Sequence, residues 1–108
     1  MTAFTNTSYG VKNIGTTPTP IINGVPSGTM AIASLIISNT TTAPITTTVY
    51  VTRATQSYYL IYQATIPVGG SLEVVQGSRV VLQTGDVLGV INSAPNSGDA
   101  WVSALTAV

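Results

Sequence analysis

PVGGSLEVVQGSRVVLQTGDVLGVINS, residues 67–93, is a run of short apolar segments separated by glycine-containing turns. Gly69-Gly70, Gln76-Gly77-Ser78 and Thr84-Gly85-Asp86 are turn sequences, because glycine adopts the backbone angles that tight turns need. Between the turns, apolar residues recur at every second position, which is the spacing of one face of a strand. The expected inward faces are Leu72 with Val74, Val80 with Leu82, and Leu88 with Val90. This stretch predicts three successive strands of an antiparallel sandwich.

The rest of the chain continues this pattern. Residues 29–38 are apolar at nearly every position, which is typical of a central strand covered on both faces. Residues 45–53 alternate, and the side chains expected inward are Ile45, Thr47, Val49 and Val51. Further strands are expected at residues 20–23, 57–62, 64–68 and 100–106. About eight strands spaced roughly 8 to 12 residues apart, without a helical repeat, predict an all-β protein, a single antiparallel β-sandwich that is jelly-roll-like.

The N-terminal segment differs from the remainder. Residues 1–19 are rich in Thr, Asn, Gly and Pro and contain only scattered apolar side chains. Such a segment cannot bury a continuous apolar face by itself, and short N-terminal segments stay ordered only when docked. We therefore expect an extended N-terminal arm at residues 1–19, either disordered or laid across a neighbouring subunit, followed by a β-sandwich domain at residues 20–108.

The charge content is low for a soluble domain. Charged residues make up 6% of the 108 residues and the net charge is zero, whereas about 25% is usual. Either other copies or a larger assembly cover part of the apolar surface, or the many Thr and Ser hydroxyls keep the surface hydrated. The scarcity of charge favours assembly, and we expect a homo-oligomer, with a trimer as the first candidate.

Composition also bears on partners and location. Three basic residues spread over the chain cannot form the positive stripe that binds phosphates, so no nucleic acid partner is expected. The longest apolar run, residues 30–37, is far shorter than the roughly 20 residues of a membrane helix, so no membrane partner is expected. Met1 is followed by polar residues rather than a signal segment, which favours synthesis in the cytoplasm without a signal peptide.

The sequence offers little for catalysis. It has no histidine and no cysteine, which removes the usual general base and the commonest soft metal ligands. Its acids, Glu73, Asp86 and Asp99, are single residues far apart in the chain, and Asp86 suits a turn in which its carboxylate accepts backbone N–H groups. We expect no catalytic residues, no metal site and no cofactor, and hence a protein that is not an enzyme.

Four aromatic side chains are candidate contact residues. Tyr58, Tyr59 and Tyr62 lie in one segment, and Trp101 lies on the last expected strand. In a regular strand Tyr58 and Tyr62 share one face and Tyr59 takes the other. A core or subunit contact is favoured over a glycan-binding platform, because aromatic residues dominate cores and interfaces.

Charged residues on neighbouring strands suggest ion pairs. Arg53 and Arg79 are each expected to pair with Glu73 or Asp86, across strands or between subunits. Such pairs would fix strand register or an interface rather than catalyse a reaction.

Three segments together resemble a known family. VPSGTMAIASLIISNTT, TTTVYVTR and YYLIYQATIPVGGSLEVVQGSRVVLQTGDVLGV are similar to a family of small bacteriophage virion proteins with a β-sandwich fold. The shared features are a V-P-x-G-x turn before an apolar strand that ends in Asn-Thr, and an I-P-x-G-x-S-L-E segment before an L-x-x-G-D-x-L strand. The resemblance covers residues 20–106 and includes no catalytic residue.

The resemblance implies a place in the virion. The expected function is that of a capsid decoration or cement protein that self-associates and contacts other virion proteins, such as the major capsid protein. The alternatives are a component of the tail, collar or fibre, or a carbohydrate-binding module that uses surface tyrosines.

Overall fold

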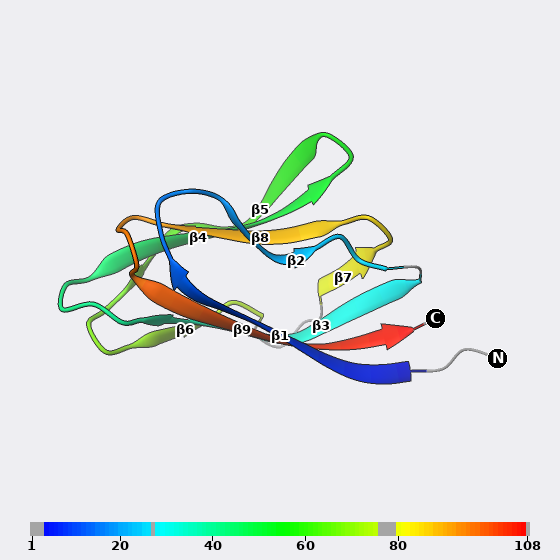
Figure 1. Ribbon diagram of the computed structural model, residues 1–108, viewed down its shortest axis with the longest axis horizontal. Coiled ribbons are helices and arrows are strands. Elements are labelled where there is room, and N and C mark those ends of the chain that lie inside the picture. Colours follow the sequence, from blue (N-terminus) through cyan, green and yellow to red (C-terminus); the bar gives the residue numbers. More distant parts are fainter. Residues whose placement is uncertain (1–3, 27, 76–79, 108) are drawn as a thin grey trace.

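The computed structural model describes residues 4–26, 28–75 and 80–107, and these residues form nine strands and no helix (Figure 1). The strands are β1 (Phe4–Ile14), β2 (Thr19–Asn23), β3 (Thr29–Asn39), β4 (Ile45–Arg53), β5 (Gln56–Ile66), β6 (Ser71–Glu73), β7 (Val80–Gln83), β8 (Val87–Asn92) and β9 (Gly98–Ala107). The all-β sandwich expected from the sequence is confirmed, with nine described strands rather than about eight. Nowhere in this part of the chain is there a helix of the length and hydrophobicity needed to cross a membrane.

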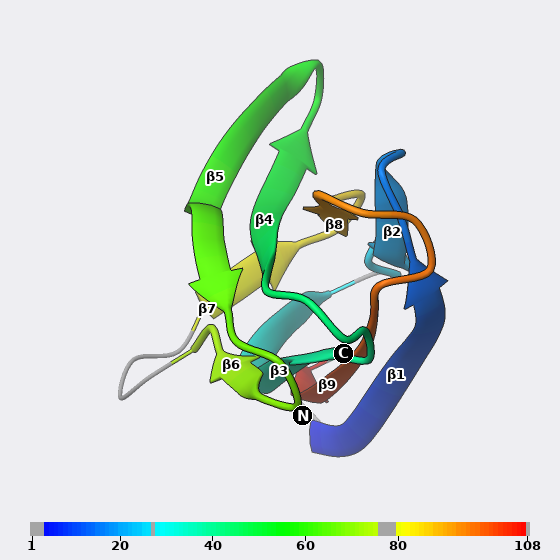
Figure 2. The same cartoon turned by 90° about the vertical axis from the view of Figure 1, so that its left-hand side faces the viewer.

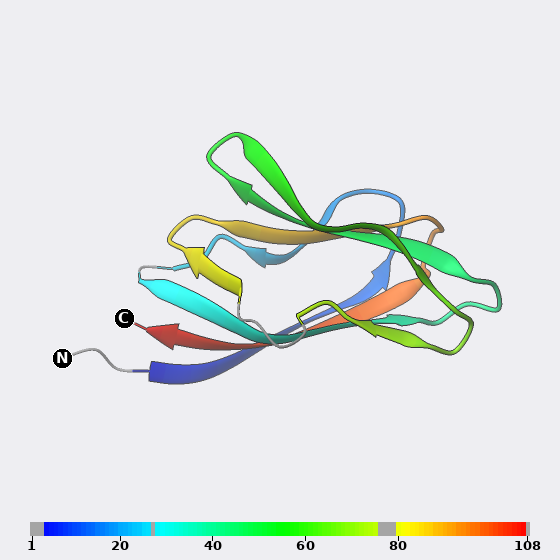
Figure 3. The same cartoon turned by 180° about the vertical axis from the view of Figure 1, so that it is seen from behind.

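The strands form two antiparallel sheets that pack face to face (Figure 1). Sheet A has the order β1-β9-β3-β6, with β7 also paired to β3, and sheet B has the order β2-β8-β4-β5. The chain passes repeatedly between the sheets, so each sheet combines strands from both ends of the sequence. Figure 3 shows the same two layers from behind.

The glycine-rich stretch at residues 67–93 forms β6, β7 and β8, as predicted. β6 pairs with residues 36–38 of β3, and β7 pairs with residues 29–32, so these short strands follow one another along the same edge of β3. The turn at residues 84–86 then takes the chain to sheet B, where β8 lies between β2 and β4. The turn expected at residues 76–78 lies outside the described residues.

β3 is a central strand of sheet A, but only one of its faces is covered. Met30, Ile32, Leu35 and Ile37 are buried between the sheets, whereas Ile36 is 42% exposed. The register with β9 shifts between Ile32 and Ser34, and this bulge at Ala33 keeps both halves of the apolar set facing inward. The chain by itself does not cover both faces as expected, because in its described part no second layer packs on the outer face of sheet A.

β4 follows the predicted alternation. Ile45, Thr47, Val49 and Val51 are buried as expected, and the strand has the expected bounds. Together with the inner faces of β3, β8 and β9, these side chains form the core between the sheets. The fully buried members of the core are Ile14, Ile22, Met30, Ile32, Leu35, Ile37, Val49, Ile66, Leu82, Leu88, Val90 and Val102.

The side chain of Asn39 ties the two sheets together at one end. It is 5% exposed and lies at the end of β3, in sheet A. Its Nδ2 donates to the carbonyl oxygens of Ala43 and Ile66, at 2.9 and 3.1 Å, and its Oδ1 accepts from the backbone N–H of Thr41. Because Ile66 is the last residue of β5 in sheet B, this amide links the ends of strands from both layers.

The N-terminal segment is part of the sandwich in this structure. Residues 4–14 are extended, as expected of an arm, but they form β1 and pair with β9 of the same chain along nearly its whole length. Tyr9 and Val11 pack against the core and Ile14 is 1% exposed. The separation of residues 1–19 from the domain overlooked this weak alternation, because polar Thr7 occupies an inward position and interrupts the apolar pattern.

The hairpin of β4 and β5 extends beyond the rest of sheet B, as Figure 2 shows. β5 is a single strand of 11 residues where two were expected. The irregularity anticipated near Gln63 is present. Gln63 has a positive φ of 51°, which lies outside the extended region of a regular strand, and the register with β4 shifts on either side of Val49.

Replacing Leu35 by Ala should lower the free energy of unfolding by about 2–5 kcal/mol, because Leu35 is fully buried and its loss leaves a cavity between the sheets. Val68→Ala is the matched control, since Val68 is 53% exposed and should change stability by no more than about 0.5 kcal/mol. Urea denaturation followed by circular dichroism measures both. Equal effects of the two substitutions would contradict the placement of Leu35 in the core.

Candidate functional site

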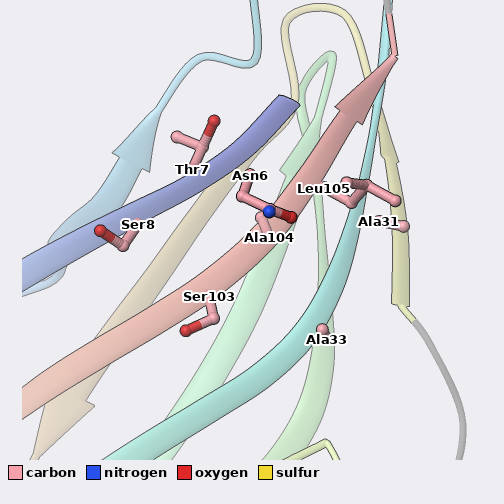
Figure 4. A pocket seen from close by; sticks show the side chains of 8 residues that line it. All are labelled: Asn6, Thr7, Ser8, Ala31, Ala33, Ser103, Ala104 and Leu105. Atoms are coloured by element: carbon pink, nitrogen blue, oxygen red, sulfur yellow. The ribbon is translucent and has the colours of Figure 1, made fainter. Parts of the chain in front are cut away.

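The outer face of sheet A carries a shallow hollow of about 450 Å³ lined mostly by small side chains from β1, β9 and β3 (Figure 4). Strand register explains it: Asn6 lies opposite Leu105, which lies opposite Ala31, and the neighbouring row has Ser8 opposite Ser103. Ala33, at the bulge of β3, completes the floor. Small residues in adjacent rows leave space that larger side chains would fill, so we call this surface the small-residue hollow.

Trp101 stands beside the small-residue hollow on the same face. It is 55% exposed and lies between Gly10 of β1 and Ile36 of β3 in the register of the sheet. A Cβ at Gly10 would lie 2.8 Å from Cε3 and Cζ3 of the indole, so the ring lies over the glycine backbone. Trp101 and Ile36 therefore form an apolar ridge. A second hollow of about 310 Å³ is lined by this ridge together with Lys12 and Asp99.

The outer face of sheet B repeats the arrangement of an aromatic ring over a glycine. Tyr50 of β4 lies opposite Gly89 of β8, and a Cβ at Gly89 would overlap the tyrosine ring. Burial raises the pKa of the Tyr50 hydroxyl. A glycine inside a strand pattern commonly marks such a close approach, and this is the sequence signal that could have identified both pairs.

Beside Tyr50 lies a groove of about 310 Å³, which we call the tyrosine groove. It is lined by Pro18, Tyr50, Thr52, Ser57, Tyr59 and Ile91. Tyr50 lies opposite Tyr59, and Thr52 lies opposite Ser57 with their hydroxyl oxygens 3.0 Å apart. Sequence reasoning missed Pro18, Tyr50 and the hydroxyl pair, because the groove brings together segments separated by more than 70 residues in a chain of 108.

The tyrosines of β5 do not face as the sequence predicted. The rings of Tyr59 and Tyr62 meet edge to face with centroids 5.1 Å apart, so these two share the outer face. Tyr50 pairs with Tyr59, whereas the preceding residue, Val49, pairs with Ile61. Leu60 is therefore an extra residue in β5, and beyond it the side chains of β5 point to the opposite faces from those expected of a regular strand. Tyr58 lies opposite the inward-facing Val51, and it lines a separate hollow with Arg53 and Val81.

The four aromatic candidates therefore do not form one platform. Tyr59 and Tyr62 lie on the outer face of sheet B, whereas Trp101 lies on the outer face of sheet A. Each of Tyr58, Tyr59, Tyr62 and Trp101 is more than half exposed, so none belongs to the core of this chain.

Arg53 and Asp86 form an ion pair within the chain. The guanidinium Nε donates to Oδ1 of Asp86 at 2.9 Å, and Nη2 donates to Oδ2 at 2.6 Å. The Asp86 side chain is 2% exposed and that of Arg53 is 50% exposed, so the carboxylate is buried while the guanidinium remains in contact with solvent. Oδ2 also accepts the backbone N–H of Gln83 at 2.8 Å, which is the turn contact expected from the sequence.

The Arg53 hydrogen bond lowers the pKa of Asp86, and the Gln83 N–H adds to this effect, while burial of the carboxylate acts in the opposite direction. A carboxylate whose pKa is lower in the folded chain than in the unfolded chain stabilises the fold above its unfolded pKa. That stabilisation is lost as the pH falls through the folded pKa.

The remaining charged candidates are held by backbone and hydroxyl contacts. Glu73 on β6 accepts from the Ser34 hydroxyl at 3.0 Å and from the Leu35 N–H at 3.1 Å. Asp99 is the second residue of β9, and its Oδ1 accepts the N–H of Asn13 at 3.0 Å. Arg79 lies outside the described residues. Within the described ranges, no three acidic, histidine or cysteine side chains gather as metal ligands would.

Comparison with known proteins gives no relative. No family model, no curated protein and no solved structure matches this chain.

Acid should weaken the fold through Asp86. We expect the free energy of unfolding of the unmodified chain to fall as the pH drops below about 4, and the fall to be smaller in Asp86→Asn and in Arg53→Met. Urea denaturation at a series of pH values measures this slope. Identical slopes in the three proteins would show that the ion pair does not stabilise the fold.

Gly89→Ala should displace the Tyr50 ring and lower the free energy of unfolding by about 1–3 kcal/mol, because the added methyl group overlaps the ring. Gly15→Ala is the control, since the nearest atom to its added Cβ is 3.6 Å away. Thermal unfolding compares the two variants. A Gly89→Ala protein as stable as Gly15→Ala would contradict the close approach of ring and glycine.

Proposed function

We propose that this protein is a non-enzymatic structural protein that associates with copies of itself and serves as a decoration or cement protein on a phage capsid. The observation that carries the self-association is the outer face of sheet A, where Trp101 stands beside the small-residue hollow. The particle itself is proposed from the resemblance of residues 20–106 to small phage virion proteins.

The exposed ridge supports assembly energetically. Trp101 and Ile36 are 55% and 42% exposed in the single chain. Removing apolar surface from water is favourable by roughly 25 cal/mol per Å², before the entropy cost of association, and an aromatic side chain supplies a large share of such surface. The small-residue hollow is lined by no charged side chain, so a second copy could approach it without removing a charge from water.

The position of ridge and hollow suits a two-fold contact. Trp101 and Ser103 are two residues apart on β9, or about 7 Å along the strand. Because both features lie on one face, a second copy turned by 180° would place its Trp101 near the first copy's hollow and receive the first Trp101 in return. The trimer expected of a structural virion protein would need contacts through another surface, such as the free edge of β1, which carries a single charged side chain, Lys12.

The arrangement of the acids supports a non-enzymatic role. Glu73, Asp86 and Asp99 each accept hydrogen bonds from the fold, from Leu35, Arg53 and Asn13 respectively. A general acid or base must instead reach a substrate in a cleft with its proton-accepting oxygen available.

Light scattering on a sizing column tests the self-association. We expect the unmodified chain to elute as an oligomer and Trp101→Ala to elute at a lower mass, because the substitution removes the largest exposed apolar side chain of the ridge. Val68→Ala, which alters an equally exposed residue in the loop after β5, should keep the oligomer mass. A monomeric unmodified chain at every concentration measured would overturn the proposal.

A further inference from the structure

We propose that the tyrosine groove on the outer face of sheet B binds a neutral carbohydrate. The groove lies on the opposite layer from the small-residue hollow, so this site is independent of the self-association face proposed above.

The groove presents aromatic surface held in a fixed orientation. The Tyr50 ring lies against the backbone of Gly89, which limits its movement, and Tyr59 lies beside it on the neighbouring strand. The edge-to-face contact with Tyr62 holds Tyr59 in turn. Rings that are already positioned lose little conformational entropy when a ligand binds.

The groove also presents hydroxyl groups next to these rings. Thr52 and Ser57 share one hydrogen bond, which leaves one hydroxyl hydrogen and further lone pairs to bind a ligand. A pyranose ring has a C–H face that packs on the electron-rich face of a tyrosine and a rim of hydroxyl groups that both donate and accept. Aromatic rings beside paired hydroxyls therefore match both parts of a sugar.

The chemistry of the lining excludes other ligand classes. All six lining residues, from Pro18 to Ile91, are uncharged, so an ionic ligand would lose hydration without gaining a charged partner. A purely apolar ligand would cover the Thr52 and Ser57 hydroxyls and leave their remaining hydrogen-bonding groups unpaired. The volume of about 310 Å³ is at the small end of the range for small-molecule sites, which suits one or two sugar rings.

The test uses saturation-transfer NMR on the full chain with four neutral disaccharides: cellobiose, maltose, lactose and diacetylchitobiose. We expect at least one of them to bind, with transfer strongest at its ring C–H protons. Tyr59→Ala should weaken that binding roughly five- to tenfold, and Tyr59→Phe, which keeps the ring, should retain most of it. Thr52→Val should also weaken binding, because it removes a hydroxyl and keeps the shape of the side chain.

Tyr58→Ala is the matched control. Tyr58 is 58% exposed and Tyr59 is 59% exposed, yet Tyr58 lines a different hollow, so its substitution should leave sugar binding unchanged. Circular dichroism shows that each variant is folded.

Three outcomes would overturn the proposal: none of the four disaccharides binds, Tyr58→Ala weakens binding as much as Tyr59→Ala, or Tyr59→Ala reduces the oligomer mass without affecting any sugar. The last outcome would identify the groove as a contact between copies. Trp101→Ala separates this proposal from the self-association, because it should lower the oligomer mass and leave sugar binding intact.

Discussion

The structure depends on the burial of one apolar face of each sheet against the other. With 6% charged residues and no cysteine, the chain has few ion pairs and no disulfide to hold its layers together. Every strand must therefore keep its apolar side chains inward, and a slip of one residue would turn them to the solvent. The bulge at Ala33 serves this requirement, because it keeps Leu35 and Ile37 inside after β3 bends.

The polar groups of the interior support the same contact. Asn39 joins the end of β3 to the end of β5 through its amide, and Asp86 joins the turn before β8 to Arg53 at the end of β4. Both side chains are almost fully buried and both bind backbone groups as well. They fix how strands and turns meet at the ends of the sandwich.

The outer faces carry the features that bear on function. In each sheet an aromatic ring lies over a glycine of the neighbouring strand, Trp101 over Gly10 and Tyr50 over Gly89. The surroundings of the two rings differ. Small side chains and Ile36 lie beside Trp101, whereas two hydroxyl groups and the pair Tyr59 and Tyr62 lie beside Tyr50. This contrast is why we assign a protein contact to sheet A and a neutral small ligand to sheet B.

Most of the strands, turns and inward faces were predictable from the sequence alone, because the direction of a side chain in a strand depends on local backbone geometry. Ile45 to Val51 and the stretch at residues 67–93 follow this rule. Three features follow from the assembled sheets alone. Residues 4–14 pair with β9, the bulge at Leu60 places Tyr59 and Tyr62 on one face, and Pro18 reaches the tyrosine groove. Each of these depends on partners distant in the sequence, and strand pairing selects them by packing and hydrogen bonding that no local pattern records.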